Sequence, residues 1–356
     1  MSLKVYVGMS GGVDSSLTAA LLKESGYEVV GVYMKNWTKN LSGFICPWQD
    51  DFNDAKRVAV GLNIQFKVYD FENDYRQKVV NYLLDGYKNG ITPNPDIMCN
   101  QEIKFKLFLD SALSDGADKI ATGHYARIVK SSNKYWLKTA IDLNKDQSYF
   151  LYRITQTALQ KSFMPIGEYL KPNVRKMATD RGLSTAQKKD SQGICFVGKI
   201  GIKDFLIGEL GLQPAGSIVD NTGQIVGEHD GAIFYTIGQR HGLNIGGGLP
   251  YYVTGKDMAK NIVYVTRDIQ DVSLWSDKIS LTNMHWLTES IQNMSIKDNI
   301  MVRLRYRAPL VGVNRLEQVN SNQWQLRLNE EAKAVAVGQS AVFYQNDIVL
   351  GGGIIN

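Results

Sequence analysis

Alternation of strand-like and helix-like segments in the first third of the chain constrains the fold more than any other feature. Short runs rich in β-branched and apolar residues predict strands, and each is followed by a segment with helical periodicity. The predicted strands cover 4–9, 29–34, 65–71 and 119–122, and the predicted helices cover 15–25, 51–61, 73–89 and 101–114. Such alternation is typical of a parallel sheet with helices on both faces, so the loops after Met9, Met34 and Thr122 should meet at one ligand site.

The remainder of the chain changes character twice. Residues 145–182 continue the helical pattern, and we expect them to form a helical appendage to the first domain. Beyond residue 202, a hairpin pattern around Asn221 and a strand at 261–266 predict a small mixed α+β domain. From about residue 276 only short strand patterns remain, over 301–307, 311–318, 324–328 and 341–344, which favours an antiparallel β-barrel.

The length of 356 residues exceeds the usual size of a single hydrophobic core. We therefore expect an α/β protein with three domains. An N-terminal parallel sheet flanked by helices should cover 1–201, the mixed domain 202–275, and the C-terminal barrel 276–356.

Composition excludes several classes of protein. The three cysteines, Cys46, Cys99 and Cys195, are an odd number in a chain without an apolar signal peptide, which argues against a secreted disulfide scaffold. No apolar run is long enough to span a membrane, so we expect a cytoplasmic protein with no membrane partner. The net charge of +5 is too small to indicate a nucleic-acid ligand by itself.

A glycine-rich loop, Ser10-Gly11-Gly12-Val13-Asp14-Ser15, joins the first predicted strand to a helix. Glycines let the backbone approach a ligand, hydroxyls add donors, and the helix start offers unpaired N–H groups, so the loop suits a pyrophosphate. It lacks the lysine of the Gly-x-x-x-x-Gly-Lys loop and the spacing of the Gly-x-Gly-x-x-Gly turn, which weakens kinase-like and Rossmann interpretations. The structural alternative is a tight turn whose serine and aspartate cap the helix.

The loop resembles the Ser-Gly-Gly-x-Asp-Ser signature of PP-loop pyrophosphatases, which split ATP into AMP and pyrophosphate while adenylating a substrate. Five further segments are similar, in the same order, to the signatures of bacterial tRNA-specific 2-thiouridylases. They are NPDIMCN at 94–100, TGHYA at 122–126, KDQSYFL at 145–151, SQGICF at 191–196 and TIGQR at 236–240. The resemblance extends from Met9 to Gly353, which is nearly the whole chain.

This resemblance implies three groups of site residues. The ATP-binding positions would be Gly8, Met9, Ser10, Gly11, Gly12, Val13, Asp14, Ser15, Met34 and Gly123. The tRNA-binding positions would be Asn94, Pro95, Asp96, His124, Lys145, Asp146, Gln147, Arg305, Tyr306 and Gln339. Cys99, Cys195 and Asp96 would be catalytic, with no metal bound by protein ligands.

The residues around Cys99 agree with a reactive thiol. Pro93 and Pro95 favour an extended chain, and Asn100 is a candidate N-cap for a helix that starts at Gln101. Cys99 would then lie at the positive end of a helix dipole, which lowers a thiol pKa. Without the resemblance, an inert buried cysteine would be the usual interpretation.

The other two cysteines differ in context. Cys195 lies in a polar, glycine-containing loop, where a mobile thiol could meet another protein and then swing inward. In the family, the matching cysteine carries a persulfide. Cys46 has no role that the sequence supports, and packing is the default interpretation. Three thiols could also hold an iron–sulfur cluster, although their scattered spacing does not favour one.

Two polar residues near these motifs are candidates for direct chemistry. Asp96, three residues before Cys99, is placed to move a proton near the thiol, and capping a turn after Pro95 is the structural alternative. His124 follows a predicted strand at its carboxyl end, which favours a ligand contact over a core histidine.

Arginines alternate with apolar residues over 301–307, so Arg303, Arg305 and Arg307 should share one face of a strand. That face would match a phosphate backbone, and an ordinary solvated face is the alternative. The resemblance places tRNA contacts at Arg305-Tyr306 and Gly338-Gln339, although Val337 replaces the proline that the family usually has there.

The resemblance also implies the reaction. ATP with Mg²⁺ would transfer AMP to O2 of the wobble uridine in lysine, glutamate and glutamine tRNAs and release pyrophosphate. Cys195 would carry sulfur as a persulfide from a cysteine desulfurase or a sulfur-relay protein, and Cys99 would release it as sulfide, leaving a disulfide with Cys195. In a second route the persulfide attacks C2 directly. No tightly bound organic cofactor is expected.

Two other functions remain open. Another PP-loop ligase, such as a tRNA lysidine synthetase or an argininosuccinate-type enzyme, would use a nitrogen nucleophile and need no cysteine pair. A tRNA-binding or sulfur-carrier protein with a vestigial nucleotide loop would show no tRNA-dependent pyrophosphate release.

Overall fold

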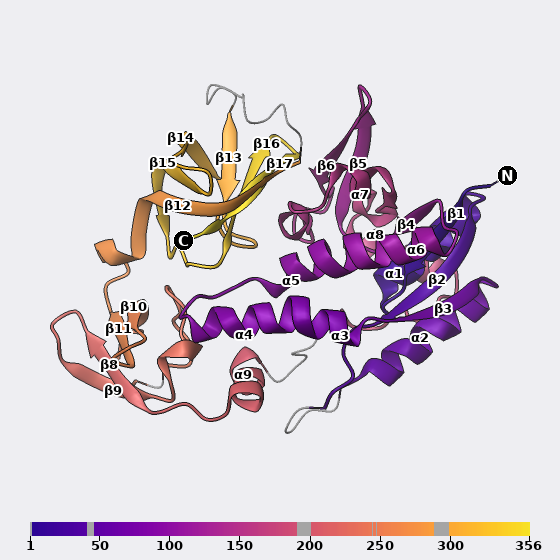
Figure 1. The fold of residues 1–356 in the computed structure, drawn as a ribbon. Coiled ribbons are helices and arrows are strands. Elements are labelled where there is room, and N and C mark those ends of the chain that lie inside the picture. The colour runs from indigo at the N-terminus through magenta and orange to yellow at the C-terminus, as the bar shows by residue number, and fades with distance from the viewer. Residues whose placement is uncertain (1, 41–45, 191–200, 244, 247, 288–298) are drawn as a thin grey trace.

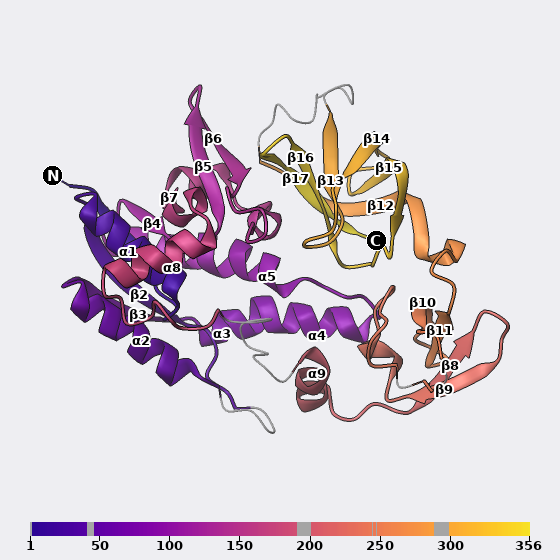
Figure 2. The ribbon, with the colours of Figure 1, turned by 180° about the vertical axis from the view of Figure 1, so that it is seen from behind.

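Three sheets organise the protein, which we describe from a computed structural model covering residues 2–40, 46–190, 201–243, 245–246, 248–287 and 299–356 (Figure 1). A parallel sheet with its helices lies near the N-terminus, a small sheet lies at the opposite end, and a barrel carries the C-terminus; the reverse view shows the same arrangement (Figure 2). This architecture confirms the predicted fold class. None of the described helices is long and apolar enough to cross a membrane.

The N-terminal sheet has five parallel strands in the order β3-β2-β1-β4-β7. The strands are β1 (Lys4–Gly8), β2 (Glu28–Lys35), β3 (Gln65–Asp70), β4 (Lys119–Ala121) and β7 (Ser162–Phe163). The first four lie where the sequence predicted them. The short edge strand β7 falls within the segment that we expected to be helical.

Helices cover both faces of this sheet. Successive side chains of a strand point to opposite sides, so each face carries apolar residues that the helices bury. On one side, Val5 and Val7 of β1 pack with α1 (Val13–Glu24), α2 (Trp48–Gly61) and α8 (Lys171–Asp180). On the other side, Tyr6 packs in a separate core with two long composite helices.

Each composite helix contains a π-helical segment. The first consists of α3 (Glu72–Tyr75), η1 (Arg76–Val80) and α4 (Asn81–Lys88), and the second of α5 (Pro95–Met98), η2 (Cys99–Leu107) and α6 (Phe108–Ser114). The second therefore starts at Pro95 and not at the predicted Gln101. Because π-helical segments are rare and frequently occur at functional sites, η2 marks this region as unusual.

A β-hairpin that the sequence did not predict precedes the segment 145–182, which we predicted as a helical appendage. It consists of β5 (Ala126–Ser131) and β6 (Lys134–Thr139) and pairs with the C-terminal strand through Lys138 and Ile348. Short helical segments follow, namely η3 (Ser148–Leu151), α7 (Gln156–Gln160), η4 (Pro165–Glu168) and α8.

The two remaining sheets match their predicted types. The small sheet, in the order β10-β11-β8-β9, consists of β8 (Gly216–Asp220), β9 (Ile225–His229), β10 (Tyr252–Asp257) and β11 (Ile262–Thr266), and follows α9 (Ile202–Leu210). The barrel consists of β12 (Trp275–Trp286), β13 (Ile300–Arg303), β14 (Val311–Gln318), β15 (Gln323–Lys333), β16 (Ser340–Gln345) and β17 (Ile348–Ile355). Pairing of β12 with β17 closes it.

Candidate active site

The glycine-rich loop lies between β1 and α1, at the carboxyl end of the parallel sheet. Ser15 Oγ accepts a hydrogen bond from Ser10 N at 3.1 Å and donates one to the Gly12 carbonyl at 3.2 Å. Gly11 has a φ of +73°, and a Cβ there would lie 2.3 Å from the Asp51 carbonyl oxygen, so this turn requires glycine. The N-cap of α1 is Gly12, which has no side chain, so the start of the helix is open to an anionic ligand. The alternative of a serine- or aspartate-capped turn is therefore wrong.

Two implied ATP-binding residues from other strands pack against this loop. A Cβ on Gly8 would lie 2.9 Å from Cε of Met34, and a Cβ on Gly123 would lie 2.7 Å from Ser15 N. Gly123 is thus needed because the segment after β4 passes close to the first turn of α1. Met9 N donates to a carbonyl of β2 at 2.8 Å, which fixes the start of the loop.

The carboxylate of Asp14 is held by two residues that the sequence did not point to. Lys171 Nζ lies 2.8 and 2.9 Å from its two oxygens, and the Tyr125 hydroxyl donates to it at 2.9 Å. Lys171 is only 7% exposed and also pairs with Asp190 at 2.9 Å. Although burial opposes the change, hydrogen bonds from Lys145 and Lys171 lower the pKa of Asp190 to about 2. Sequence offered no signal for this network, because Asp14 and Lys171 are 157 positions apart.

Cys99 lies in the second turn of its composite helix and not at the helix start. Asn94 Oδ1 accepts from Ile97 N at 3.4 Å and Pro95 follows in the first turn, so Asn94 is the N-cap and the assignment of Asn100 was wrong. The predicted lowering of the Cys99 pKa is wrong as well, because the helix-dipole effect falls off within the first turn. Cys99 is 6% exposed, and burial raises the pKa of its thiol.

Lys104 is a site residue that sequence reasoning missed. It follows Cys99 by five positions, which is the hydrogen-bonding interval of a π-helix, whereas an α-helical pattern would place the two residues on different faces. Its Nζ lies 3.4 Å from His124 Nε2. Burial raises the pKa of both Cys99 and Asp96, and the positive charge of Lys104 partly offsets that increase in each. Burial, reinforced by Lys104, lowers the pKa of His124 well below its usual value, so its imidazole is neutral near pH 7.

The segment after β4 connects the glycine-rich loop to the helix that carries Cys99. Gly123 packs against the loop, Tyr125 donates to Asp14, and His124 between them contacts Lys104. Three consecutive residues thus contact both the loop and the Cys99 helix. The geometry can therefore present a nucleotide phosphate and a thiol to one substrate.

The implied tRNA-binding residues at 145–147 are engaged within the protein. Lys145 Nζ donates to Asp190 at 2.9 Å, and Gln147 Oε1 accepts from Tyr125 N at 2.9 Å. Asp146 is 3% exposed, and burial raises the pKa of its carboxyl. The Asp146 side chain therefore shapes this segment from within.

The predicted basic face over 301–307 does not form. Strand β13 ends at Arg303, whose Nη1 pairs with Asp146 at 3.4 Å, and Arg307 has a φ of +63° in the turn that follows. Arg305, between them, is exposed. The prediction was wrong because an alternating pattern cannot show where a strand stops, and the three arginines point to different surroundings.

Tyr306 and Gln339 attach the barrel to the Cys99 helix. The ring of Tyr306 lies 4.4 Å from that of Phe150, whose carbonyl accepts from Asn100 Nδ2 at 3.1 Å. Gln339 Nε2 donates to the Thr92 carbonyl at 2.8 Å, just before the helix begins. The barrel residues implied in tRNA binding therefore lie beside the helix that carries the thiol.

Cys195 and the segment 191–196 lie outside the described residues. Cys46 is partly buried, its Sγ lies 3.6 Å from the Trp37 carbonyl oxygen, and burial raises the pKa of its thiol. These contacts favour packing as its role. Among the described residues, no three His, Cys, Asp or Glu side chains gather in a way that could hold a metal ion.

Comparison with known proteins covers the whole chain. Three family models match in succession: the tRNA methyl transferase HUP domain at 3–199, the tRNA methyl transferase PRC-barrel domain at 203–267, and the aminomethyltransferase beta-barrel domain at 276–355. The chain is 46% identical over 354 residues to the tRNA-specific 2-thiouridylase MnmA of Bacillus subtilis, covering 99% of this chain and 95% of the relative. It is 44% identical over 354 residues to the protein of the same name from Bacillus cytotoxicus, covering 99% and 94%. A solved 4-thiouridine synthetase with bound RNA and ATP is 15% identical, with a TM-score of 0.38 over 56% of this chain and 46% of that chain.

Proposed function

Because the chain belongs to the family of tRNA-specific 2-thiouridylases, as its full-length identity shows, we propose that it catalyses ATP-dependent 2-thiolation of the wobble uridine in lysine, glutamate and glutamine tRNAs. The matching family models are named after methyl transfer, but the relatives at 44–46% identity are named as thiouridylases. A loop suited to pyrophosphate beside a buried thiol also favours thiolation, because methyl transfer needs neither.

The observation that carries this proposal is the segment Gly123-His124-Tyr125. It contacts the glycine-rich loop on one side and Lys104 of the Cys99 helix on the other. A base bound at this segment would therefore meet both an adenylating group and a sulfur-handling thiol. Holding reacting groups together in this way supplies a large part of catalysis.

The first step would be adenylation. Uracil O2 is a poor leaving group, so O2 attacks the α-phosphorus of ATP, AMP becomes bonded to O2, and pyrophosphate leaves. The loop from Gly8 to Ser15, with Met34 and Gly123 packed around it, would bind the nucleotide, and Mg²⁺ would accompany its phosphates as part of the substrate.

The second step would be sulfur transfer. A persulfide on Cys195, supplied by a cysteine desulfurase or a sulfur-relay protein, would be attacked by the Cys99 thiolate, forming a Cys99–Cys195 disulfide and releasing sulfide. Sulfide would then displace AMP at C2, and a dithiol reductant would reopen the disulfide. In the second route, the terminal sulfur of the persulfide attacks C2 and displaces AMP. The Cys99 thiolate then attacks Sγ of Cys195, which breaks the S–S bond, leaves 2-thiouridine and forms the Cys99–Cys195 disulfide. Asp96, whose carboxyl pKa burial raises, would carry the proton in either route.

The tRNA would bind across the residues that the family resemblance indicates. We assign direct contacts to Arg305, Tyr306 and Gln339 of the barrel and to Asn94, Pro95 and His124 beside the thiol. Lys145 and Gln147 border the same region, whereas the buried Asp146 would act by shaping that segment. We also propose that the chain divides into domains at 1–201, 202–275 and 276–356.

Replacing Asp14 tests the assignment. Asp14→Asn keeps the size of the side chain but removes the charge that Lys171 pairs with, so tRNA-dependent pyrophosphate release should be abolished and 2-thiouridine should be absent from digested tRNA analysed by mass spectrometry. Asp118→Asn is the matched control, because Asp118 binds Lys4 N just before β4, at the amino end of the sheet. Normal pyrophosphate release by Asp14→Asn would exclude the loop as the ATP site.

A further inference from the structure

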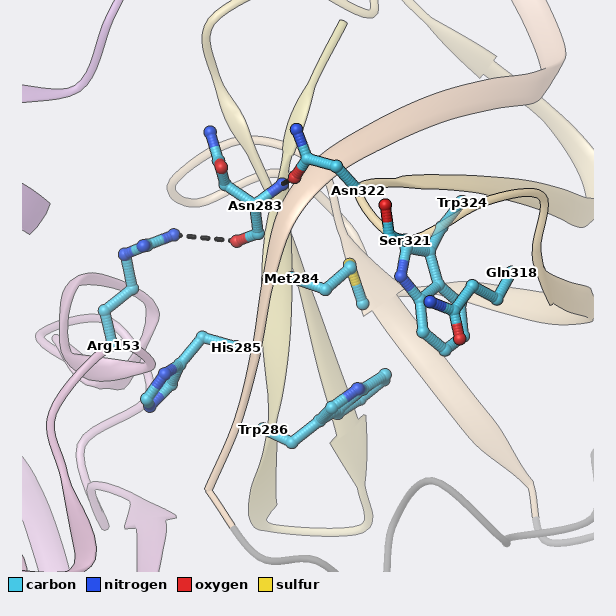
Figure 3. Close-up of a pocket in the computed structure, with 9 residues that line it drawn as sticks. All are labelled: Arg153, Asn283, Met284, His285, Trp286, Gln318, Ser321, Asn322 and Trp324. Carbon is cyan, nitrogen blue, oxygen red and sulfur yellow. Dashed lines mark hydrogen bonds between the residues drawn. The ribbon is translucent and has the colours of Figure 1, made fainter.

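A polar pocket lies outside the candidate active site, where the barrel faces the segment that follows η3. Its volume is about 360 Å³, at the lower end of the range of about 300–1,000 Å³ that is usual for ligand sites. Figure 3 shows Arg153 and His285 on one side of it and Trp324 and Gln318 on the other. None of the residues assigned to ATP binding, tRNA binding or catalysis lines this pocket.

Two tryptophans give the pocket an aromatic wall. The rings of Trp286 and Trp324 meet edge to face, with centroids 6.0 Å apart and planes at 72°. Trp286 Nε1 is buried and has no hydrogen-bond partner among the described residues. Because an unsatisfied buried donor costs free energy, a ligand that brought an acceptor to this N–H as the rings adjusted would be stabilised.

The described lining of the pocket carries a positive charge and no negative charge. Among the lining residues that the structure describes, Arg153 carries the only full charge, and burial lowers the pKa of His285 so that its ring is neutral. Asn322, exposed at the rim, uses its Oδ1 to accept from Asn283 N at 3.3 Å, which leaves its NH₂ group directed to other partners. An aromatic wall, amide groups and one cation without a carboxylate together suit a planar, anionic ligand such as a nucleotide.

The pocket is connected to the Cys99 helix. Arg153 Nη1 donates to the Asn283 carbonyl at 2.9 Å, while its Nε donates to Gln101 Oε1 at 2.5 Å, two residues beyond Cys99. One arginine therefore joins the pocket to the helix that carries the thiol.

We propose that this pocket binds one unstacked nucleotide of the tRNA substrate, a nucleotide other than the one that is modified. This inference rests on the proposed function. The base would lie against Trp324 and accept a hydrogen bond from Trp286 Nε1, and Arg153 would face its phosphate. Protein recognition of RNA commonly uses such splayed bases stacked on aromatic side chains.

Two variants measure the two contacts separately. Trp324→Ala removes the stacking surface and should raise the tRNA Kd about 5- to 150-fold, since base stacking contributes about 1–3 kcal/mol. Trp286→Phe keeps a ring but removes the N–H, and should raise the Kd about 2- to 12-fold, the effect of one ordinary hydrogen bond of about 0.5–1.5 kcal/mol. Both Kd values are measured by filter binding over a range of salt concentrations, with circular dichroism to verify folding.

The salt dependence separates this pocket from a phosphate-binding surface. Neither variant removes a charge, so the slope of log Kd against log salt should stay at the wild-type value, and pyrophosphate release at saturating tRNA should be unchanged. Unchanged tRNA affinity in both folded variants would overturn the proposal. So would Trp324-dependent binding of free AMP or UMP in equilibrium dialysis with tRNA affinity unaltered, because the ligand would then be a free nucleotide. Failure of the proposed function would be seen in a different measurement, because the wild-type chain would then form no 2-thiouridine.

Discussion

Gly123 provides a sharp test of how the candidate site is built. The ideal Cβ of an alanine there would lie 2.7 Å from Ser15 N and 2.8 Å from the Asp14 carbonyl carbon, whereas ordinary contacts begin at 3.4 Å. The first turn of α1 would have to retreat by about 0.7 Å to admit Gly123→Ala. Displacements of about 1 Å can lower rates about 100-fold, and overpacking typically costs about 1–3 kcal/mol of stability. We therefore expect pyrophosphate release to fall about 100-fold, while a loss of about 1–3 kcal/mol in stability leaves the chain folded.

The assay compares tRNA-dependent pyrophosphate release with urea unfolding for Gly123→Ala. Gly61→Ala is the matched control, because Gly61 ends α2 and a Cβ there would meet nothing within 4 Å. The control should keep full activity and gain about 0.4–1 kcal/mol in stability. Wild-type pyrophosphate release by folded Gly123→Ala would refute the inference that this glycine positions the loop.

Three further predictions concern tRNA binding, the barrel contact and the thiols. Arg305→Ala should weaken tRNA binding and reduce the log–log salt slope by about 0.9, one phosphate contact, and an unchanged slope would place the RNA elsewhere. Arg303→Met should lower the free energy of unfolding in urea by about 3 kcal/mol, because it removes the cation that pairs with the buried Asp146 carboxylate. Asp146→Asn in the same chain should restore part of that loss, and simple additivity of the two changes would exclude the pairing. Cys99→Ser and Cys195→Ser should each abolish thiolation yet bind tRNA normally. Mass spectrometry of the protein after incubation with a persulfide donor should show that only Cys195→Ser fails to accept a persulfide, and persulfide found on Cys99 would reverse the roles.

The first four strands of the parallel sheet could be predicted because each is a short apolar run followed by a segment with helical periodicity. The hairpin of β5 and β6 could not, although its alternation is visible in retrospect. Its two-residue turn, Ser132-Asn133, has φ values of +48° and +62°, a conformation usually marked by Asn-Gly. Without glycine the turn gave no signal, and so the strands beside it were overlooked.

The candidate site was predictable where it follows a contiguous motif and not where it depends on burial or long-range pairing. The loop from Ser10 to Ser15 is a motif whose glycine requirement the structure explains. The pKa of Cys99 was predicted in the wrong direction, because its sign depends on how deeply the helix is buried. The contact of Lys171 with Asp14 joins α8 to α1 across the fold, and no local pattern encodes it.

Lys104 offers a test of the electrostatics around the thiol. Burial raises the pKa of Cys99 and of Asp96, and the Lys104 charge acts against that increase in both. Lys104→Met removes the opposing charge, so both pKa values should rise. Because the thiolate is the reactive form, the limb of the rate profile that increases with pH should move to higher pH. A residue that merely supported the fold would lower the rate without moving the profile.

Alkylation of Cys99 by iodoacetamide reads its thiolate directly, in a chain whose Cys46 and Cys195 are serine. At pH 8, Lys104→Met should react more slowly than the parent chain. The difference should shrink as the pH rises above the pKa that Cys99 has in either protein. Lys106→Met is the control, since Lys106 lies on the same helix and pairs with Glu102 at 2.9 Å, and its reactivity should match that of the parent. Equal alkylation profiles for Lys104→Met and the parent would remove Lys104 from the electrostatics of the thiol and leave its contact with His124 as a structural one.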